Sequence, residues 1–294
     1  MRVVLAGASG LIGTALAESL RADGVAVTTL VRRPARGADE VEWLTESASL
    51  DPSALEGAAA VVGLNGASVG RFPWTASYKR TLLSSRLVPT HALAEAVRAL
   101  GSDAPALISG SAVGYYGSGT DLTERSPRGD TFLAHLCEQW EGAALRADRT
   151  TRVALLRTAP VVHAEGVLKP LIRLTRLGLG GPIGRGTQSW PWISLEDEVR
   201  AIRHVIETDV SGPVNLAGPH RGTANDLGFA LAVRLNRPYL VRAPAWALRL
   251  ALGRDATEAL LTTDARVVPA VLEASGFAFR HPTVEAAVVA AVPA

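Results

Sequence analysis

Short apolar runs, mostly of β-branched residues, alternate with longer segments of helical hydrophobic spacing through the first half of the chain. A run that is apolar throughout indicates a strand buried on both faces, and such strands form parallel sheets covered by helices. Right-handed crossovers between these strands predict a doubly wound α/β fold. The expected strands are 3–6, 25–31, 41–44, 60–64, 106–109, 153–156 and 214–217, and the expected helices are 11–22, 75–100, 131–148 and 195–207.

The second half of the chain has a less regular pattern. The polar segment 118–130 and the glycine-rich segment 178–186 are expected to be loops. Beyond residue 223 helical patterns alternate with prolines, and 276–283 is expected to form a short strand and a turn. No internal repeat or low-complexity linker divides the sequence, so its length fits one large domain or two that pack intimately.

Composition and charge exclude several classes of protein. With 48% hydrophobic and 20% charged residues over 294 positions, the chain can fill a large core, which excludes intrinsic disorder. The net charge is only +2 and basic residues form no long run, so we expect no nucleic-acid partner. No apolar stretch reaches the roughly 18 residues of a membrane span, so we expect a soluble, cytoplasmic protein without a membrane partner. Cys137 is the single cysteine, which excludes an intramolecular disulfide and a cysteine-based zinc site, and we expect no metal.

Three glycines mark the turn between the first expected strand and the first expected helix. In a dinucleotide-binding loop one glycine allows a tight turn, a second lets the backbone approach a pyrophosphate, and a third lets the helix pack closely on the sheet. The free N–H groups at the start of the helix then face the phosphate charge. The GxxGxxG pattern lies where this mechanism requires it, although a plain strand-to-helix turn is the alternative. The candidate contacts are Gly7, Ser9, Gly10, Leu11, Ile12 and Gly13.

Two arginines follow the second expected strand and bear on the choice of coenzyme. NAD-binding loops usually place an acidic residue there to accept from the ribose 2′-hydroxyl, but this chain has Arg32 and Arg33 and no acid before Asp39. A guanidinium pairs with a phosphate in a bidentate manner, so NADP(H) fits better than NAD, with Arg32 as the first choice. Ordinary surface charge is the alternative. Asn65 and Gly66, after the fourth expected strand, are candidate cofactor contacts or a simple Asn-Gly turn.

Longer segments resemble a known family. The chain is similar to the extended short-chain dehydrogenase/reductase superfamily, and within it to an atypical, YfcH-like epimerase family whose members carry a C-terminal domain of unknown function. The resemblance covers nearly the whole chain, and the last two of the segments that carry it are more specific than the glycine pattern. Those segments are GASGLIG at 7–13, SSRLVPTHALAEAV at 84–97, SGSAVGYYG at 109–117, LCEQWEGAA at 136–144, LRTAPVV at 156–162, GLGGPIGRGTQSWPWISLEDEVRAI at 178–202 and DARVVPAVLEASGFAFRHPTVEAAV at 264–288.

The resemblance implies a Rossmann-type doubly wound parallel sheet with a smaller C-terminal α+β substrate lobe. On this basis we expect 1–165 and 195–222 to form the NADP-binding domain, and 166–194 and 223–294 to form the lobe that binds a small-molecule substrate. Extended members of the superfamily often dimerise through helices, so the chain is expected to be a monomer or a homodimer.

The catalytic pattern of the superfamily is incomplete in this chain. Ordinary members use a serine together with a YxxxK pair, in which the lysine ammonium favours the phenolate of the tyrosine. Ser111 matches the serine, but no tyrosine of this chain has a lysine four residues on, and the corresponding helix has Phe132 and Leu136. The polarising hydroxyl is therefore kept while the acid and its lysine are missing.

Three interpretations of this gap remain open from the sequence. Tyr116, or its neighbour Tyr115, supplies the proton from the loop after the fifth strand, or it only packs or touches the substrate. His135 replaces the acid, or it is an ordinary surface histidine. In the third interpretation no hydride chemistry occurs and the protein is a non-catalytic NADPH-binding sensor. We take Ser111 and Tyr116 as the catalytic candidates of an NADP-dependent oxidoreductase or epimerase acting on a small carbonyl or alcohol compound.

A few further residues have weaker claims to the substrate site. Trp190 and Trp192 stack on a flat substrate or pack in the core, and Asp197 borders the cleft and opens a helix. Arg157 and Arg185 bind an anionic group or form structural ion pairs. Lys79 reaches the cleft or is a solvated helix lysine.

Overall fold

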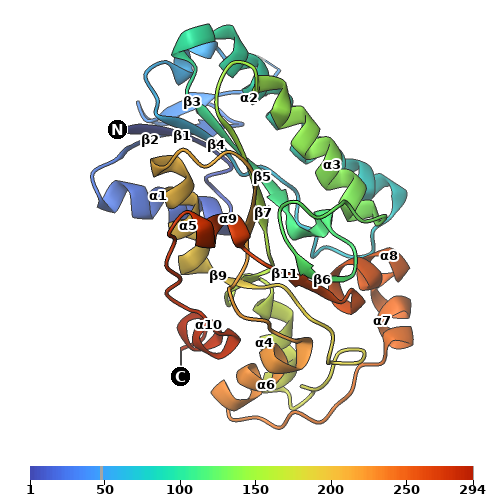
Figure 1. Ribbon diagram of the computed structural model, residues 1–294. Helices are drawn as coiled ribbons and strands as arrows, with labels where there is room; N and C mark the ends of the chain where they lie inside the picture. Colours follow the sequence, from blue (N-terminus) through green and yellow to red (C-terminus); the bar gives the residue numbers. More distant parts are fainter. Residues whose placement is uncertain (47–48, 294) are drawn as a thin grey trace.

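The computed structural model describes residues 1–46 and 49–293, and an open parallel sheet lies at its centre (Figure 1). Its seven strands lie in the order β10-β7-β5-β4-β1-β2-β3, with every neighbouring pair parallel. The chain thus winds outward from β1 in both directions, which is the Rossmann-type doubly wound fold predicted from the sequence. The strands are β1 (Arg2–Ala6), β2 (Ala26–Val31), β3 (Glu40–Glu42), β4 (Ala60–Gly63), β5 (Ala106–Ala112), β7 (Val153–Thr158) and β10 (Gly212–Leu216).

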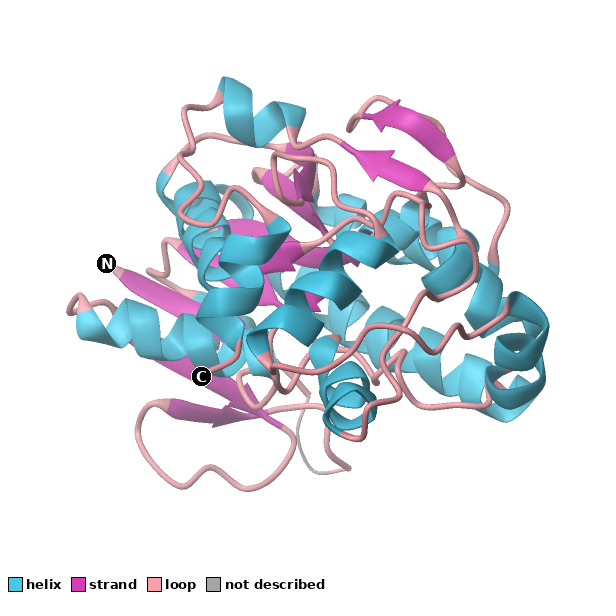
Figure 2. Cartoon of the chain, turned by 90° about the horizontal axis from the view of Figure 1, so that it is seen from below, coloured by secondary structure: helices cyan, strands magenta, loops and turns pink. Residues whose placement is uncertain are grey.

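Helices cover both faces of this sheet because its central strands are apolar on both sides (Figure 2). On β1, Val3 and Leu5 face a core that includes α1 (Leu11–Ala22) and α5 (Leu195–Glu207). Val4 and Ala6 face the opposite core, which includes α2 (Ala76–Ala99) and the end of α3 (Phe132–Ala144). This alternation is the period of two that strand geometry imposes.

The helix boundaries follow local capping signals. Thr75, Thr131 and Ser194 each accept a hydrogen bond from a backbone N–H in the first turn of the helix that follows. The bounds of α5, which Ser194 caps, agree with the sequence expectation, and so do those of α1, whose N-cap Gly10 has no side chain. Strands β5 and β7 run three and two residues further than expected, to Ala112 and Thr158. The sequence pattern predicted that both strands end earlier, because Ser111 and Arg157 are polar and polar residues in a strand ordinarily indicate its edge or its end.

The remaining elements build a smaller lobe below the carboxyl edge of the sheet (Figure 1). Trp190 and Trp192 share its core with Leu227, Leu231 and Val288. Its helices are α4 (Leu168–Arg176), α6 (Ala224–Arg234), α7 (Ala245–Leu252), α8 (Arg254–Thr257) and α10 (Val284–Ala291), while α9 (Ala270–Ala274) packs on β10. Two small parallel sheets pair β6 (Gly119–Leu122) with β11 (Ala265–Val267) and β8 (Val161–Val162) with β9 (Ile193–Ser194).

Short helical turns complete the described chain. They are η1 (Pro52–Leu55), η2 (Gly101–Asp103), η3 (Val113–Tyr115), η4 (Leu145–Ala147) and the π-helical η5 (Glu258–Thr262). Within residues 1–46 and 49–293, no helix has the length and apolar character needed to cross a bilayer.

Two expectations for the irregular parts were wrong. The segment 118–130 is not all loop, since β6 lies within it, and 276–283 contains no strand. The strand of the C-terminal tail is instead β11, which pairs with β6 from more than 140 residues away along the chain. A strand of only three residues depends on a distant partner, so its local sequence carries little signal. The return of α5 and β10 to the main sheet is consistent with the two-segment domain expected at 1–165 and 195–222, whose boundaries stay a prediction.

Candidate cofactor and substrate site

Gly7 and Gly13 are required by the fold of the loop between β1 and α1. Gly7 has φ +88°, and a Cβ there would lie 2.7 Å from the carbonyl carbon of Leu64. A Cβ on Gly13 would overlap the carbonyl oxygen of Gly7. Both positions therefore allow the close approach of backbone to backbone that brings the start of α1 against the sheet.

Gly10 differs from the other two glycines, because the protein itself leaves space for a side chain there. Its φ is −82°, which any residue adopts, and the nearest atom to an added Cβ is the Gly7 oxygen at an ordinary 3.5 Å. As the N-cap of α1, Gly10 offers no side chain to the first N–H groups of the helix, and the first turn has no acidic residue. The N-terminus of α1 is therefore uncapped and faces the open space at Gly10, which we call the cradle. Such a helix N-terminus fits an anionic group.

Asn65 lies two residues after the end of β4, with its backbone against Gly7 of the same loop. Its Oδ1 atom is buried and has no hydrogen-bond partner among the described residues. The structure has no turn at Asn65-Gly66, so the turn interpretation of this pair does not apply. An unpaired buried acceptor beside the open cradle is suited to receive a hydroxyl of a bound molecule.

The two arginines after β2 have different surroundings. The Arg33 guanidinium donates to both carboxylate oxygens of Glu40, at 2.7 and 2.6 Å. These hydrogen bonds lower the pKa of Glu40 to about 2, so the pair is ionic at neutral pH. Arg32 is exposed and forms no hydrogen bond or ion pair with any described residue. Of the two side chains, Arg32 is the one free to take a phosphate.

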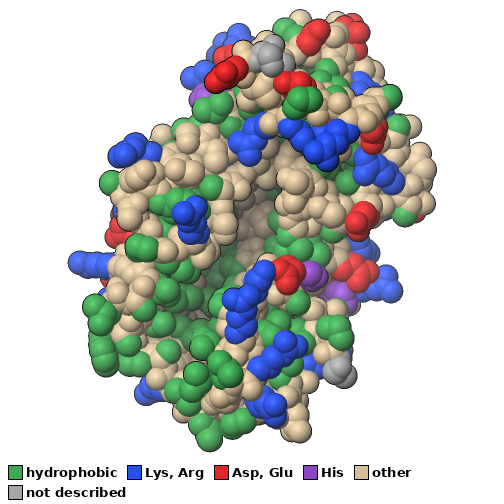
Figure 3. All heavy atoms as spheres, turned by 180° about the vertical axis from the view of Figure 1, so that it is seen from behind, with side chains coloured by type: hydrophobic (Ala, Val, Ile, Leu, Met, Phe, Trp, Pro, Cys, Tyr) green, Lys and Arg blue, Asp and Glu red, His purple; other side chains and the backbone are tan. Residues whose placement is uncertain are grey.

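The glycine loop, Asn65 and Arg32 together fit a dinucleotide that carries an extra phosphate. Seen from behind, the molecule is hollowed at the middle of one face, and Lys and Arg side chains gather on the upper rim of the hollow (Figure 3). No group of three or more His, Cys, Asp or Glu side chains able to hold a metal ion occurs in the part of the chain that the structure describes.

Ser111, at the end of β5, donates a hydrogen bond of 2.7 Å to Oε1 of Glu141 on α3. The same carboxylate receives two hydrogen bonds of 2.8 Å from the guanidinium of Arg157 on β7. All three residues are buried. Because the Glu141 carboxylate accepts from the Arg157 guanidinium, Ser111 acts as the donor toward it and has only lone pairs left for another partner.

Tyr116 belongs to the same buried network. Its hydroxyl accepts a hydrogen bond of 2.8 Å from Arg157 and donates one of 2.7 Å to Oδ1 of Asn215 on β10. Burial raises the pKa of the Tyr116 hydroxyl above its usual value, so this group keeps its proton. The Arg157 guanidinium also stacks on the Tyr115 ring, 3.6 Å from its centroid. Thus the structure joins Ser111 and Tyr116 through Glu141 and Arg157, and both hydroxyls already have protein partners.

Glu141 and Asn215 are members of this network that the sequence did not identify. The one available signal was a charged residue on the same face of α3 as buried Cys137, one turn earlier. Arg157 was considered for either an anionic substrate or an ion pair, and the structure shows the ion pair.

The helix that carries the YxxxK pair in the superfamily has a buried face here that is apolar except for Glu141. Leu133, Leu136 and Trp140 are buried, and burial raises the pKa of the Cys137 thiol to about 12. His135 lies on the exposed face, with Arg128 Nη1 at 3.0 Å from its Nδ1. Among these α3 side chains, therefore, none presents a free acid on the buried side of the helix.

The remaining substrate candidates have structural partners. Lys79 pairs with Asp255 of α8, which links α2 to the lobe, and Arg185 pairs with Asp264 at 2.7 Å. The indole N–H groups of Trp190 and Trp192 donate to the carbonyls of Leu260 and His220 at 2.7 and 3.2 Å. Both tryptophans pack in the core of the lobe, in agreement with the packing alternative.

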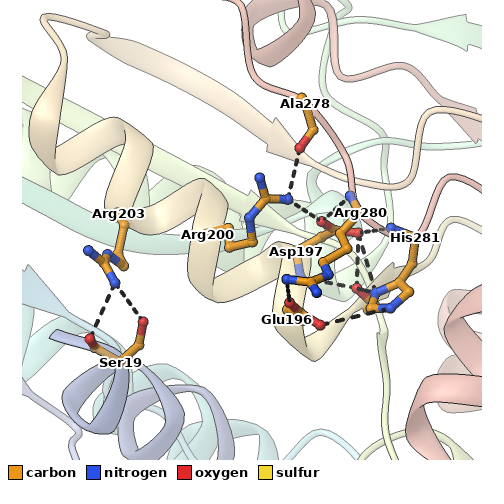
Figure 4. A network of polar contacts seen from close by, with 9 residues as sticks. Ser19, Glu196, Asp197, Arg200, Arg203, Ala278, Arg280 and His281 are labelled. Atoms are coloured by element: carbon orange, nitrogen blue, oxygen red, sulfur yellow. Dashed lines mark hydrogen bonds and ion pairs between the residues drawn. The ribbon is translucent and has the colours of Figure 1, made fainter. Parts of the chain in front are cut away.

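Asp197 opens α5, as expected, but it binds the C-terminal tail (Figure 4). Its two carboxylate oxygens each accept a hydrogen bond of 2.8 Å, from the backbone N–H groups of Arg280 and His281. Arg200 donates to Asp197 at 3.1 Å and to the carbonyl of Ala278 at 2.8 Å. These contacts fasten the tail to the sheet domain, next to a surface hollow of about 380 Å³ that Ser194, Glu196 and His281 help to line.

Glu198, on the same helix, is a buried carboxyl with an incomplete set of partners. Thr158 donates a hydrogen bond of 2.8 Å to its Oε1, while Oε2 has none among the described residues. Burial raises the pKa of Glu198 to about 8, so the group is largely protonated at neutral pH.

This shift predicts a pH dependence of stability. Because the folded protein holds the Glu198 proton more tightly than the unfolded chain does, the free energy of unfolding should fall as the pH rises from the ordinary glutamate pKa toward about 8. Glu198→Gln keeps an acceptor for Thr158 and removes the titration. Thermal melts at about pH 5 and about pH 8 should show a smaller loss of Tm in the variant than in the unaltered protein. Equal losses in the two proteins would contradict this assignment.

Comparisons with known proteins agree over almost the full length of the chain. The model of the NAD dependent epimerase/dehydratase family matches residues 3–217, and that of a domain of unknown function (DUF1731) matches residues 243–291. The epimerase family protein ML0860 of Mycobacterium leprae is 44% identical over 287 residues, which cover 96% of this chain and 92% of that protein.

Two solved structures extend the comparison to the fold. A crystal structure of human epimerase family protein SDR39U1 (isoform 2) with NADPH has a TM-score of 0.88 at 29% identity, and the match covers 99% of both chains. The crystal structure of a nucleoside-diphosphate sugar epimerase from Corynebacterium glutamicum has a TM-score of 0.78 at 31% identity, covering 99% of this chain and 58% of that one.

Proposed function

The chain belongs to the NAD dependent epimerase/dehydratase family, and from this membership we propose that it binds NADP(H) and acts as an oxidoreductase or epimerase on a small carbonyl or alcohol compound. The observation that carries the coenzyme assignment is the open space at Gly10 before an uncapped helix N-terminus. The crystallisation of the human relative with NADPH supports the same coenzyme. Bound NADPH supplies a hydride.

Each candidate contact residue has a separate part in binding NADP(H). The N–H groups of Leu11, Ile12 and Gly13, at the start of α1, bind the pyrophosphate, and Gly10 admits it to close range. The Oδ1 atom of Asn65 accepts from a ribose hydroxyl. Arg32 pairs with the 2′-phosphate, which is absent from NADH. Ser9 is exposed in the turn before α1 and is the remaining candidate contact for the coenzyme.

Replacing Arg32 by alanine should weaken NADPH binding about tenfold or more and leave NADH binding nearly unchanged, because only NADPH has the 2′-phosphate. Calorimetric titration with each coenzyme measures the two affinities. Arg33→Ala is the matched comparison, since Arg33 is already paired with Glu40 and should matter less. Equal weakening of both coenzymes by Arg32→Ala would contradict the phosphate role, and a larger effect of Arg33→Ala would transfer it to Arg33.

For the chemical step, we propose that Ser111 contacts the substrate oxygen and that Tyr116 supplies the proton. The family position of Ser111 supports its role, and the raised pKa of Tyr116 supports a group that arrives protonated. Each hydroxyl must change a partner to act: Ser111 now donates to Glu141, and Tyr116 to Asn215. The proposal therefore requires a local rearrangement of the buried network when substrate binds.

A second candidate function is a non-catalytic NADPH-binding regulator. The observation that favours it is that both hydroxyls bond to buried protein partners, while the one buried acid of α3, Glu141, is already paired with Arg157. A regulator needs the coenzyme cradle but no free acid. Cytoplasmic location and a monomeric or homodimeric state remain predictions in both cases.

A screen of small carbonyl compounds for the loss of NADPH absorbance separates the two functions. Turnover that requires the protein and a particular carbonyl compound supports the enzyme. A protein that binds NADPH and becomes more resistant to proteolysis, yet turns over no carbonyl or alcohol, supports the regulator. Failure to bind NADPH at all would contradict both.

A further inference from the structure

Helix α7 is apolar but has no buried residue. Its sequence is AWALRLAL, in which seven of the eight residues are alanine, leucine or tryptophan. Trp246 is 70% exposed and Leu250 is 84% exposed. Amphipathic helices of folded proteins normally turn such side chains toward a core, so α7 has apolar surface that the fold does not use.

Neighbouring segments extend this apolar surface. Leu240 and Val241 donate backbone hydrogen bonds of 2.8 and 3.0 Å to the Gly180 carbonyl, which places the approach to α7 beside the end of α4. Leu240 is 81% exposed. We call the exposed set the apolar tip of the lobe, and green side chains gather over this end of the molecule at the lower left of Figure 3. The tip consists of Leu177, Leu179, Leu240, Val241, Trp246 and Leu250.

The two chain segments that carry the apolar tip contain charges of one sign only. Residues 168–185 and 229–254 contain nine Lys and Arg residues and no Asp or Glu. Some of these cations pair with acids outside the two segments, as Arg249 and Arg254 do with Glu258. Arg176, Arg237 and Arg242 are exposed and have no carboxylate partner among the described residues. The tip is therefore a set of protruding leucines and a tryptophan within a cationic surround.

We propose that the apolar tip docks the protein on the surface of a lipid bilayer that contains anionic headgroups. Leucine and tryptophan side chains enter the boundary between headgroups and acyl chains, while arginines remain at the headgroup level and pair with lipid phosphates. Each basic residue near an anionic leaflet adds to the attraction. This mode of binding needs no spanning helix.

A second copy of the chain fits the same surface less well. A two-fold contact through the apolar tip would place the same arginines opposite one another, with no acid within the two segments to neutralise them. A bilayer also accepts individually protruding side chains without a complementary shape. The sequence excluded a membrane partner only because it has no spanning segment, and docking through a surface does not depend on one.

Sedimentation with vesicles tests the proposal. Vesicles of phosphatidylcholine with phosphatidylglycerol should bind the full chain, vesicles of phosphatidylcholine alone should bind it weakly, and added salt should reduce binding. The affinity of the Leu240→Ser/Leu250→Ser variant for these vesicles should fall by about tenfold or more, since it loses two of the inserted side chains. Arg237→Gln/Arg242→Gln should lose about fivefold for each charge removed. Val88→Ser, which alters an exposed apolar residue of α2, is the matched control and should bind normally.

Tryptophan fluorescence gives an independent readout because Trp246 is the exposed one of the six tryptophans. The other five are at most 8% exposed. Vesicles with brominated phosphatidylglycerol acyl chains should quench and blue-shift the Trp246 emission, and Trp246→Phe should lose this signal while it still sediments with vesicles. Absence of sedimentation at low salt, or equal binding of the Leu240→Ser/Leu250→Ser variant and the Val88→Ser control, would overturn the proposal. So would a dimer in solution that the leucine variant dissociates, because the occupant would then be a second copy.

Discussion

Replacing Gly10 by valine should abolish NADPH binding and leave the protein folded. The backbone at Gly10 has a φ of −82° that valine adopts, and an added Cβ meets the protein only at 3.5 Å from the Gly7 oxygen. The valine side chain would instead occupy the cradle before α1, where the pyrophosphate must come close to the N–H groups of the helix. We expect a loss of affinity of about a hundredfold or more, measured by calorimetric titration, because the whole diphosphate contact is blocked.

Gly13→Ala provides the comparison that separates binding from folding. Its Cβ would overlap the Gly7 carbonyl oxygen, so this smaller substitution should lower the Tm as well as binding. Gly10→Val should retain a Tm within a few degrees of the unaltered protein, apart from the modest cost of an apolar N-cap. A folded Gly10→Val protein that binds NADPH with unchanged affinity would show that the diphosphate lies elsewhere.

Replacing Arg157 by methionine should destabilise the fold by about 3–5 kcal/mol, the usual cost of leaving one member of a buried ion pair without its partner. Glu141 would lose both of its hydrogen bonds from the guanidinium, at 2.8 Å each. Tyr116 would lose a donor, and the Tyr115 ring would lose the cation stacked on it. Urea unfolding followed by circular dichroism measures the change in the free energy of unfolding.

The double variant Arg157→Met/Glu141→Met tests whether an uncompensated charge causes that loss. Removing both charges leaves no ion to desolvate, so the double variant should be more stable than Arg157→Met alone, although Ser111 then lacks its acceptor. If the single variant unfolds at the same urea concentration as the unaltered protein, the network does not hold the strands together. If the double variant loses as much stability as the two single substitutions together, the loss comes from packing and not from an uncompensated charge.

The sheet and the glycine loop could be predicted because both are local signals. Val3 to Ala6 form a run that is apolar on both faces, and Gly7 follows it at the turn where the phosphate loop begins. Capping residues such as Ser194 fix helix starts by hydrogen bonds within a few residues. The fold class and the cofactor loop depend on such patterns, which are complete within about fifteen residues of sequence.

The buried network could not be predicted, because its members come from four separate elements. Glu141 lies on α3, Arg157 on β7 and Asn215 on β10, and no spacing in the sequence relates them. A charged residue in the sequence is ordinarily exposed, so its burial becomes evident only once a partner is placed beside it. The same limit applies to Arg33, whose pairing with Glu40 depends on the register of β2 with β3.

The most direct measurement is a calorimetric titration of the unaltered protein with NADPH. A saturable complex with one NADPH for each chain, tighter than the complex with NADH, is the expected result, since the cradle at Gly10 takes the diphosphate and Arg32 takes the additional phosphate. The contrary result is that no complex is detected at NADPH concentrations well above those that saturate other dinucleotide-binding proteins. That result would contradict the claim that this chain binds NADPH.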